Sequence, residues 1–192
     1  MSDIFLQGEK IAFRPVSKDD YSLIYEWFND PEVTYFMFTG QRPTSLEKVS
    51  EIMDTDLKSE RNVIFTIIDK ANNQAIGLCG LYEINNTAQK AEMRIIIGNK
   101  DSWGRGYGTE SVEIINYYGF DRLNLHRIYL GVTGENIGAI KTYEKAGYLH
   151  EGVLKEDIYR NSRYYDSIRM GFLREYYYEI FFKDHQKKFA IK

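Results

Sequence analysis

The chain has 192 residues, of which 43% are hydrophobic and 28% are charged, with a formal net charge of −3. These values are typical of a globular protein and carry no basic footprint for nucleic acid. The single cysteine, Cys79, excludes an internal disulfide and fits a reducing compartment. The N-terminus lacks the basic and apolar regions of a signal peptide, and no apolar run could span a bilayer. We therefore expect a cytoplasmic protein without a membrane partner.

Hydrophobic periodicity and turn residues predict a mixed α/β protein in one domain, residues 1–192, with residues 174–192 as a C-terminal helical extension. Ser17 with Asp20 and Thr44 with Glu47 have capping-box spacing and predict two helix starts. In chain order, the pattern predicts a strand at 10–16, helices at 19–30 and 45–59, strands at 62–69, 74–84 and 90–98, a helix at 109–123, a strand at 126–132, a helix at 136–146, strands at 148–159 and 164–173, and a helix in the tail.

Three alternate glycines, Gly104, Gly106 and Gly108, separate a predicted strand from a predicted helix. Backbone N–H groups at a helix N-terminus are unsatisfied and carry partial positive charge, and the absence of Cβ atoms lets a phosphate approach them. A tight strand-to-helix turn without a ligand would use the same residues. Neither a P-loop nor a dinucleotide fingerprint fits, because no Gly-Lys-Ser/Thr follows and Thr109 stands where the last Gly or Ala belongs.

The stretch SWGRGYGTESV, after the strand AEMRIII, resembles the acetyl-CoA-binding motif of the GNAT acyltransferases, Gln/Arg-x-x-Gly-x-Gly/Ala. Trp103 stands at the first motif position, as in the branch containing the ribosomal-protein N-terminal acetyltransferases and the spermidine acetyltransferases. The segment NLHRIYLGVTGENIGAIKTYEKAGYLHEGVLKE is similar to a second block of that branch. The resemblance covers residues 8–173 and implies a mostly antiparallel mixed sheet, flanked by helices, with a splayed pair of strands that holds acetyl-CoA.

The resemblance also implies where acetyl-CoA binds. The pyrophosphate would lie on backbone N–H groups of Trp103, Gly104, Arg105, Gly106, Tyr107, Gly108 and Thr109. The pantetheine arm would pair like a strand with the backbone of Ile95, Ile96 and Ile97. Asn136 matches a position that contacts pantetheine, and it is equally suited to cap its own helix. No metal is expected, because His126, His150 and His185 have no metal-site spacing.

Tyr143 matches the residue that gives a proton to the departing thiolate of CoA when an amine attacks the thioester directly. Without the resemblance, a tyrosine on an amphipathic helix would be read as core. Some relatives place a glutamate base at the position that is Gly131 here. Glu92 is the substitute candidate, acting through water, and a strand-face ion pair with Arg94 is the competing interpretation.

The predicted function is transfer of acetyl from acetyl-CoA to a primary amine in a ternary complex. The acceptor would be bound by the first helices, the connector at 32–43 and the turn of the last hairpin. Because Phe38, Thr39 and Gly40 bring no carboxylates, and because the aromatic run from Tyr35 to Phe38 suits a sugar face or an apolar residue, a peptide N-terminus or an amino sugar is preferred over a polyamine. A non-catalytic acyl-CoA-binding module is the alternative that would not need Tyr143.

The tail is rich in aromatic residues, including Tyr177, Phe181 and Phe182. Such a helix either closes the core of its own chain or meets a second copy in a homodimer. Cys79 lies in the middle of an apolar strand and is predicted to be a small core residue.

Overall fold

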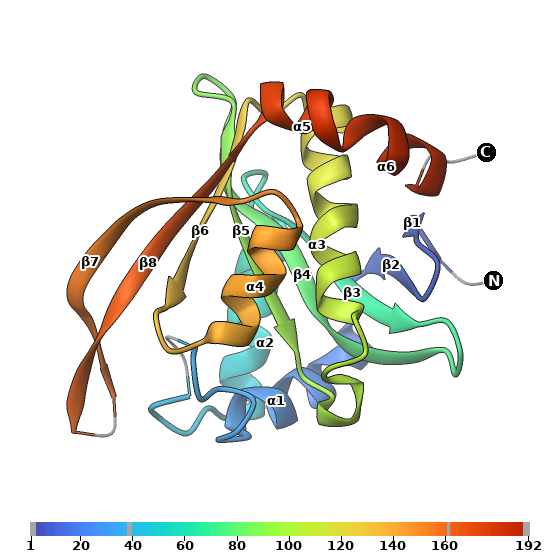
Figure 1. The fold of residues 1–192 in the computed structure, drawn as a ribbon. Helices are drawn as coiled ribbons and strands as arrows, with labels where there is room; N and C mark the ends of the chain where they lie inside the picture. Colours follow the sequence, from blue (N-terminus) through green and yellow to red (C-terminus); the bar gives the residue numbers. More distant parts are fainter. Residues whose placement is uncertain (1–2, 38–39, 161, 190–192) are drawn as a thin grey trace.

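A computed structural model describes residues 3–37, 40–160 and 162–189. The described residues form one eight-stranded mixed sheet in the order β1-β2-β3-β4-β5-β6-β8-β7 (Figure 1). All neighbours are antiparallel except β5 and β6, which are parallel. The strands are β1 (Leu6–Gln7), β2 (Ile11–Pro15), β3 (Val63–Asp69), β4 (Gln74–Asn85), β5 (Lys90–Ile97), β6 (Arg127–Thr133), β7 (Leu149–Arg160) and β8 (Arg163–Leu173).

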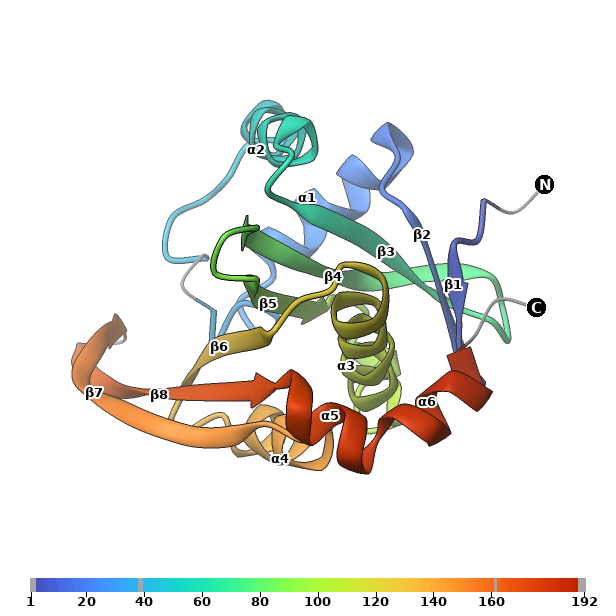
Figure 2. The same cartoon turned by 90° about the horizontal axis from the view of Figure 1, so that it is seen from above.

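Helices cover both faces of this sheet, so the expected mixed α/β architecture is confirmed. The helices are α1 (Tyr21–Asn29), α2 (Leu46–Lys58), α3 (Tyr107–Tyr117), α4 (Ile137–Lys145), α5 (Arg174–Ile180) and α6 (Phe182–Phe189). Figure 2 shows α1 and α2 on one side of the sheet and α3 and α4 on the other, with α5 and α6 beyond α3. In the described part of the chain, every helix is too short or too polar to cross a bilayer.

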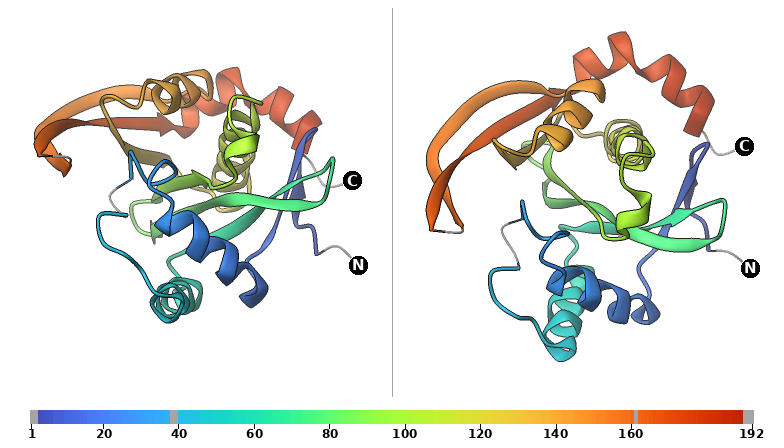
Figure 3. Two further views of the ribbon diagram at one scale, coloured as in Figure 1. Left: turned by 90° about the horizontal axis from the view of Figure 1, so that it is seen from below. Right: turned by 60° about the horizontal axis from the view of Figure 1, so that its bottom comes forward.

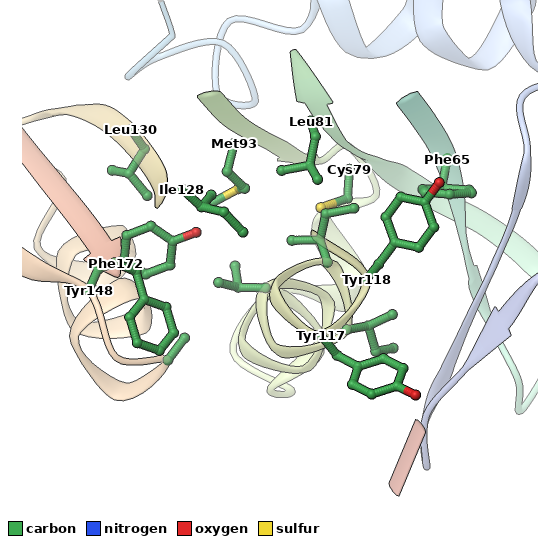
Figure 4. Close-up of a cluster of buried hydrophobic side chains, with 14 of the residues drawn as sticks. Phe65, Cys79, Leu81, Met93, Tyr117, Tyr118, Ile128, Leu130, Tyr148 and Phe172 are labelled. Atoms are coloured by element: carbon green, nitrogen blue, oxygen red, sulfur yellow. The ribbon is translucent and has the colours of Figure 1, made fainter. Parts of the chain in front are cut away.

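Two apolar clusters hold these layers together. The larger cluster lies between the sheet and α3 and includes Cys79, Met93, Ile128 and Phe172, all buried (Figure 4). The smaller one lies under α1 and α2 and includes Trp27. Burial of apolar side chains at this density is the main stabilising contribution in such a domain. Cys79 is 1% exposed, which confirms the prediction of a core residue.

The larger cluster also contains a hydrogen-bonded polar pair that ties α3 to the end of α4. The Tyr148 hydroxyl donates to Oδ1 of Asn116 (2.7 Å), and Nδ2 of Asn116 donates to the carbonyl of Ala146 (3.4 Å). Buried polar groups satisfied in this way fix the relative position of the elements that carry them. The pair therefore sets where α4 stands beside the sheet.

Three of the differences from the sequence prediction concern a helix cap, an edge strand and the tail. The N-cap of α2 is Ser45, whose hydroxyl accepts from the N–H of Lys48 (3.2 Å), rather than Thr44. Strand β1 was not predicted, because two residues give no periodicity. The tail forms two helices, because the chain turns at Phe181, whose ring packs against Phe172 (5.6 Å between centroids).

The tail closes the core of its own chain, which is the first of the two expected uses. Tyr177 is fully buried and stacks on Phe120 with 4.7 Å between ring centroids. His185 on α6 is 2% exposed and lies among the rings of Tyr177, Phe181 and Phe189. Burial, with a smaller contribution from Lys188, lowers the pKa of His185 from 6.5 to about 4.

This buried histidine predicts a pH dependence of stability. Because the folded-state pKa is depressed, the unfolded chain takes up a proton first as the pH falls below 6.5. His185 should therefore reduce the free energy of unfolding by about 2 kcal/mol between pH 7 and pH 5. Urea unfolding of the wild type and of His185→Leu at both pH values measures this difference. Equal losses in the two proteins would show that His185 does not titrate in this way.

Candidate functional site

Strands β5 and β6 separate part of the way along their length (Figure 1). Their parallel pairing ends at Glu92 with Tyr129, after which β6 pairs only with β8 on its other side. The N–H of Gly98 donates to the carbonyl of Ile76 on β4 (2.9 Å), so the carbonyl of Ile97, on the same peptide unit, points away from β4. Since backbone groups alternate along a strand, the N–H and C=O groups of Ile95 and Ile97 face the gap and those of Ile96 face β4.

One of these gap-facing groups is already engaged by a side chain. Nε1 of Trp103 donates to the carbonyl of Ile97 (2.8 Å), although the Trp103 side chain is 45% exposed overall. Trp103 thus links the glycine loop to the free edge of β5. The predicted pantetheine-binding backbone and the predicted phosphate loop are therefore contiguous.

The glycines of the loop have the freedom that an anion cradle requires. Gly104 and Gly106 adopt left-handed backbone conformations, with φ of +71° and +85°, and Gly106 is the N-cap of α3. A Cβ atom added at Gly104 or Gly108 would meet nothing within 4 Å. Packing therefore does not explain the bare backbone at Gly108, whereas a bound phosphate at the N-terminus of α3 would.

The side chains around the loop anchor it from behind. Tyr107 is buried, and its hydroxyl donates to Oδ2 of Asp69 on β3 (3.0 Å). Nζ of Lys10 donates to the carbonyl of Arg105 (3.2 Å), and the Arg105 guanidinium stacks over the Tyr107 ring at 5.2 Å. Thr109, in the first turn of α3, lines a hollow of about 160 Å³ beside Lys10. Only the backbone of Tyr107 is left to contact a ligand.

Tyr143 lies on α4, on the side of the sheet that α3 covers, and packs against the larger apolar cluster. Its ring is 6.0 Å from that of Tyr148, which the bond to Asn116 fixes. Burial raises the pKa of the Tyr143 phenol far above its usual value, with a further contribution from Cys79. The phenol is therefore protonated at neutral pH, which is the state needed to donate a proton.

Asn136 caps α4, as one of its two interpretations predicted. Its Oδ1 accepts from the N–H of Ala139 (3.1 Å). This bond leaves the side-chain amide NH₂ for another acceptor. A contact with pantetheine stays a prediction.

Glu92 forms the ion pair that competed with its role as base. Oε2 of Glu92 accepts from Nε of Arg94 (3.0 Å), and the Arg94 guanidinium lies 4.5 Å from the centroid of the Tyr82 ring. Both side chains project from the face of β5 that carries Ile96, which packs under α1 and α2. The carboxylate is engaged by the Arg94 guanidinium, so Glu92 as base stays a prediction that its geometry does not favour.

The segments predicted to bind the acceptor come together on that same side. After α1, the chain is tied to the last hairpin, because Nη1 of Arg160 donates to the carbonyl of Thr34 (2.8 Å) and Nε2 of Gln41 donates to the carbonyl of Tyr159 (3.1 Å). It is also tied to β6, because Oγ1 of Thr133 donates to the carbonyl of Phe36 (3.1 Å). Phe38 and Thr39, named in the acceptor prediction, lie outside the described residues.

Comparison with known proteins places this geometry in a family. A family model described as an acetyltransferase (GNAT) domain matches residues 10–149. The chain belongs to the GNAT acetyltransferases. It is 30% identical to an uncharacterized N-acetyltransferase, p20, of Bacillus licheniformis, over 90% of this chain and 97% of that protein. It is 29% identical to spermidine N(1)-acetyltransferase of Escherichia coli K12, over 88% of this chain and 89% of that protein.

Solved structures give the same result for the fold of this acetyltransferase. The spermidine N-acetyltransferase of Vibrio cholerae, in complex with CoA and spermine, superposes with a TM-score of 0.81 at 31% identity, covering 88% of this chain and 98% of that one. The chain is therefore an acetyltransferase. The described residues contain no cluster of three or more His, Cys, Asp or Glu side chains able to hold a metal ion.

Two features of this GNAT site were not foreseen from the sequence. The first is the bond from Trp103 to Ile97. The second is the position of Arg169 on β8, whose Nη1 would lie 2.6 Å from a Cβ atom added at Gly131. The antiparallel register of β6 with β8, in which Gly131 pairs with Arg169, brings them together. That register is set by long-range pairing, so no local sequence signal could have shown it.

The open space at Gly108 gives a direct test of the phosphate cradle. Gly108→Leu should weaken acetyl-CoA binding by at least about tenfold, because a large side chain would obstruct charge-assisted hydrogen bonds to the helix N-terminus. Gly108→Ala is the control, since the family motif accepts alanine there. Both variants should keep the wild-type Tm, because nothing lies within 4 Å of the added Cβ. Isothermal titration calorimetry measures the binding of acetyl-CoA. Equal affinities of Gly108→Leu and the wild type would show that the pyrophosphate does not bind at Gly108.

Proposed function

We propose that this enzyme transfers the acetyl group of acetyl-CoA to the primary amine of a small molecule, with Tyr143 as the general acid. The observation that carries the proposal is the continuity of three parts: the gap-facing backbone of Ile95 and Ile97, the glycine loop that Trp103 joins to it, and the partly buried phenol of Tyr143 on α4. The CoA complex of the Vibrio cholerae relative supports the assignment of acetyl-CoA as co-substrate.

The reaction proposed for these residues is a direct transfer. The neutral amine nitrogen attacks the thioester carbonyl, a C–N bond forms, and the C–S bond breaks. The departing thiolate takes the proton of the Tyr143 phenol, the nitrogen loses a proton to water, and the phenolate regains a proton from water. Because Glu92 is paired with Arg94 and Gly131 has no side chain, this geometry favours proton loss to solvent over transfer to a dedicated base. Orientation of the two substrates would then supply much of the rate enhancement.

The relatives favour a different acceptor from the one that the sequence suggested. A peptide N-terminus or an amino sugar was preferred from the residues of the connector, whereas several of the similar proteins are spermidine N-acetyltransferases. They support the polyamine alternative, and spermidine is accordingly the reference acceptor for any assay. The arginines beside Gly131 favour a second class of small amine, one that also carries an anionic group.

Substitution of Tyr143 tests the catalytic proposal. Tyr143→Phe should reduce kcat for acetyl-CoA-dependent acetylation by about 10²- to 10⁴-fold, the usual contribution of a positioned acid, while CoA affinity is unchanged. Tyr176→Phe, at a half-exposed tyrosine of α5, is the control. Release of CoA thiol with each amine gives kcat, and calorimetry gives the affinity. Full activity in Tyr143→Phe would make Tyr143 a core residue, and CoA binding without turnover of any amine would support a non-catalytic module.

A further inference from the structure

β6 has no side chain at Gly131, on the face of the sheet where the segments predicted to bind the acceptor lie. Gly131 belongs to the part of β6 that is not paired with β5. Continuing the register of Glu92 with Tyr129 by two residues sets Gly131 across the gap from Arg94. On its other side, β8 brings the Arg169 guanidinium into the space that a side chain at position 131 would fill. Two arginines therefore flank the point where the two strands part.

A buried hydroxyl points to the same space. Oγ of Ser167 would lie 3.6 Å from a Cβ atom at Gly131, and Ser167 is 0% exposed. Within the described part of the chain, this oxygen has no hydrogen-bond partner. A buried hydroxyl without a partner is costly, so a ligand that accepts its proton would relieve that cost.

A second unsatisfied group extends this surface towards the last hairpin. Nη1 of Arg160 donates to the carbonyl of Thr34, but Nη2 is buried without a hydrogen-bond partner among the described residues. It lines a hollow of about 10 Å³ with Thr133, which follows Gly131 by two residues on the same face. This hollow holds at most one water molecule, so it is too small to hold the ligand itself.

Among the described residues, the arginines of this face differ in their carboxylate partners. Arg94 is paired with Glu92, and Arg127 is paired with Glu151. Arg169 forms a longer ion pair with Asp157, at 3.5 Å, and Arg160 donates to a carbonyl rather than to a carboxylate. A second ammonium group of a polyamine would meet repulsion here, whereas an oxyanion would meet donors of matching geometry.

We propose that the acceptor amine carries an oxyanion, a phosphate or a carboxylate, which Arg169 and Ser167 bind in the space beside Gly131, with Arg94 opposite. The inference rests on the proposed acetyl transfer and narrows its acceptor. The anion is held on one side of the parting strands while the amine points between them, towards the thioester. Arg169 thereby selects the acceptor and orients it.

Matched acceptors test this selection. Release of CoA is measured with glucosamine against glucosamine 6-phosphate, with hexylamine against 6-aminohexanoate, and with spermidine. At least one anion-bearing acceptor should exceed its partner without the anion in kcat/KM by about 10- to 100-fold, the effect of a charge-assisted hydrogen bond. The pair with the larger ratio distinguishes phosphate from carboxylate.

Two arginine variants show whether Arg169 is responsible. Arg169→Gln should remove the preference, because kcat/KM should fall for the anion-bearing amines by far more than for the amines without an anion. Arg127→Gln, on the same face but matched by Glu151, should keep the preference. The proposal is overturned if the wild type shows no preference for anion-bearing acceptors, or if Arg169→Gln keeps that preference. If the wild type prefers spermidine to every anion-bearing amine, the site binds polyamines instead.

A binding measurement separates this proposal from the proposed reaction. Inorganic phosphate, added to protein saturated with CoA so that the glycine loop is filled, should raise the Tm of the wild type but not of Arg169→Gln. Equal shifts, or no shift in either protein, refute the anion site. Failure of the acetyl-transfer proposal looks different, because no amine would then release CoA even where phosphate stabilises the wild type through Arg169.

Discussion

The end of pairing between β5 and β6, at Glu92 and Tyr129, is the constraint on which the site depends. Two neighbouring strands of one sheet normally satisfy each other's backbone groups. Here the sheet stays continuous at one end and opens at the other, so the N–H and C=O groups of Ile95 and the N–H of Ile97 are left for another partner, while Trp103 donates to the Ile97 carbonyl. A chain-like ligand such as pantetheine offers alternating amide groups of the right kind, and it can be bound without any particular side chain.

The core holds this opening in place from both sides. β5 is fixed by β4, and β6 is fixed by β8, whose Phe172 lies in the larger apolar cluster. Figure 3 shows β7 and β8 reaching beyond the helices on the side away from β1. α4 stands where Asn116 and Tyr148 hold it, which sets the position of Tyr143. The strands and the helix around the candidate site are therefore positioned by contacts that lie outside the site.

Local patterns were enough to predict most of the elements and the phosphate loop. Caps, glycines and apolar periodicity act over a few residues, and so the glycine loop before α3 could be read directly from the sequence, although α3 begins at Tyr107, two residues before the predicted start. The N-cap of α2 was misplaced by one residue because Thr44 and Ser45 both offer a hydroxyl. The juxtaposition of Gly131 with Arg169 was invisible, because it arises only when β6 and β8 pair across a long separation in sequence.

The side of the site proposed to bind the acceptor depends on the same long-range pairing. The splayed strands, the glycine loop and the position of Tyr143 resemble the pattern of the family to which the chain belongs. The proposed acceptor face is built from β8 and the last hairpin. There, Arg160 and Ser167 each keep a buried polar atom without a hydrogen-bond partner among the described residues, and Arg169 forms a long ion pair with Asp157. Resemblance to spermidine acetyltransferases therefore fixes the reaction more firmly than the acceptor.

Residue-resolved amide hydrogen exchange, with and without CoA, tests the central claim most directly. If pantetheine pairs with the free edge of β5, CoA should slow exchange at the amides of Ile95 and Ile97 and leave Ile96, which already faces β4, nearly unchanged. An alternating pattern of this kind has no other simple cause. Unchanged exchange at Ile95 and Ile97 in protein saturated with CoA would contradict the account, because the gap between β5 and β6 would then not be where the ligand lies.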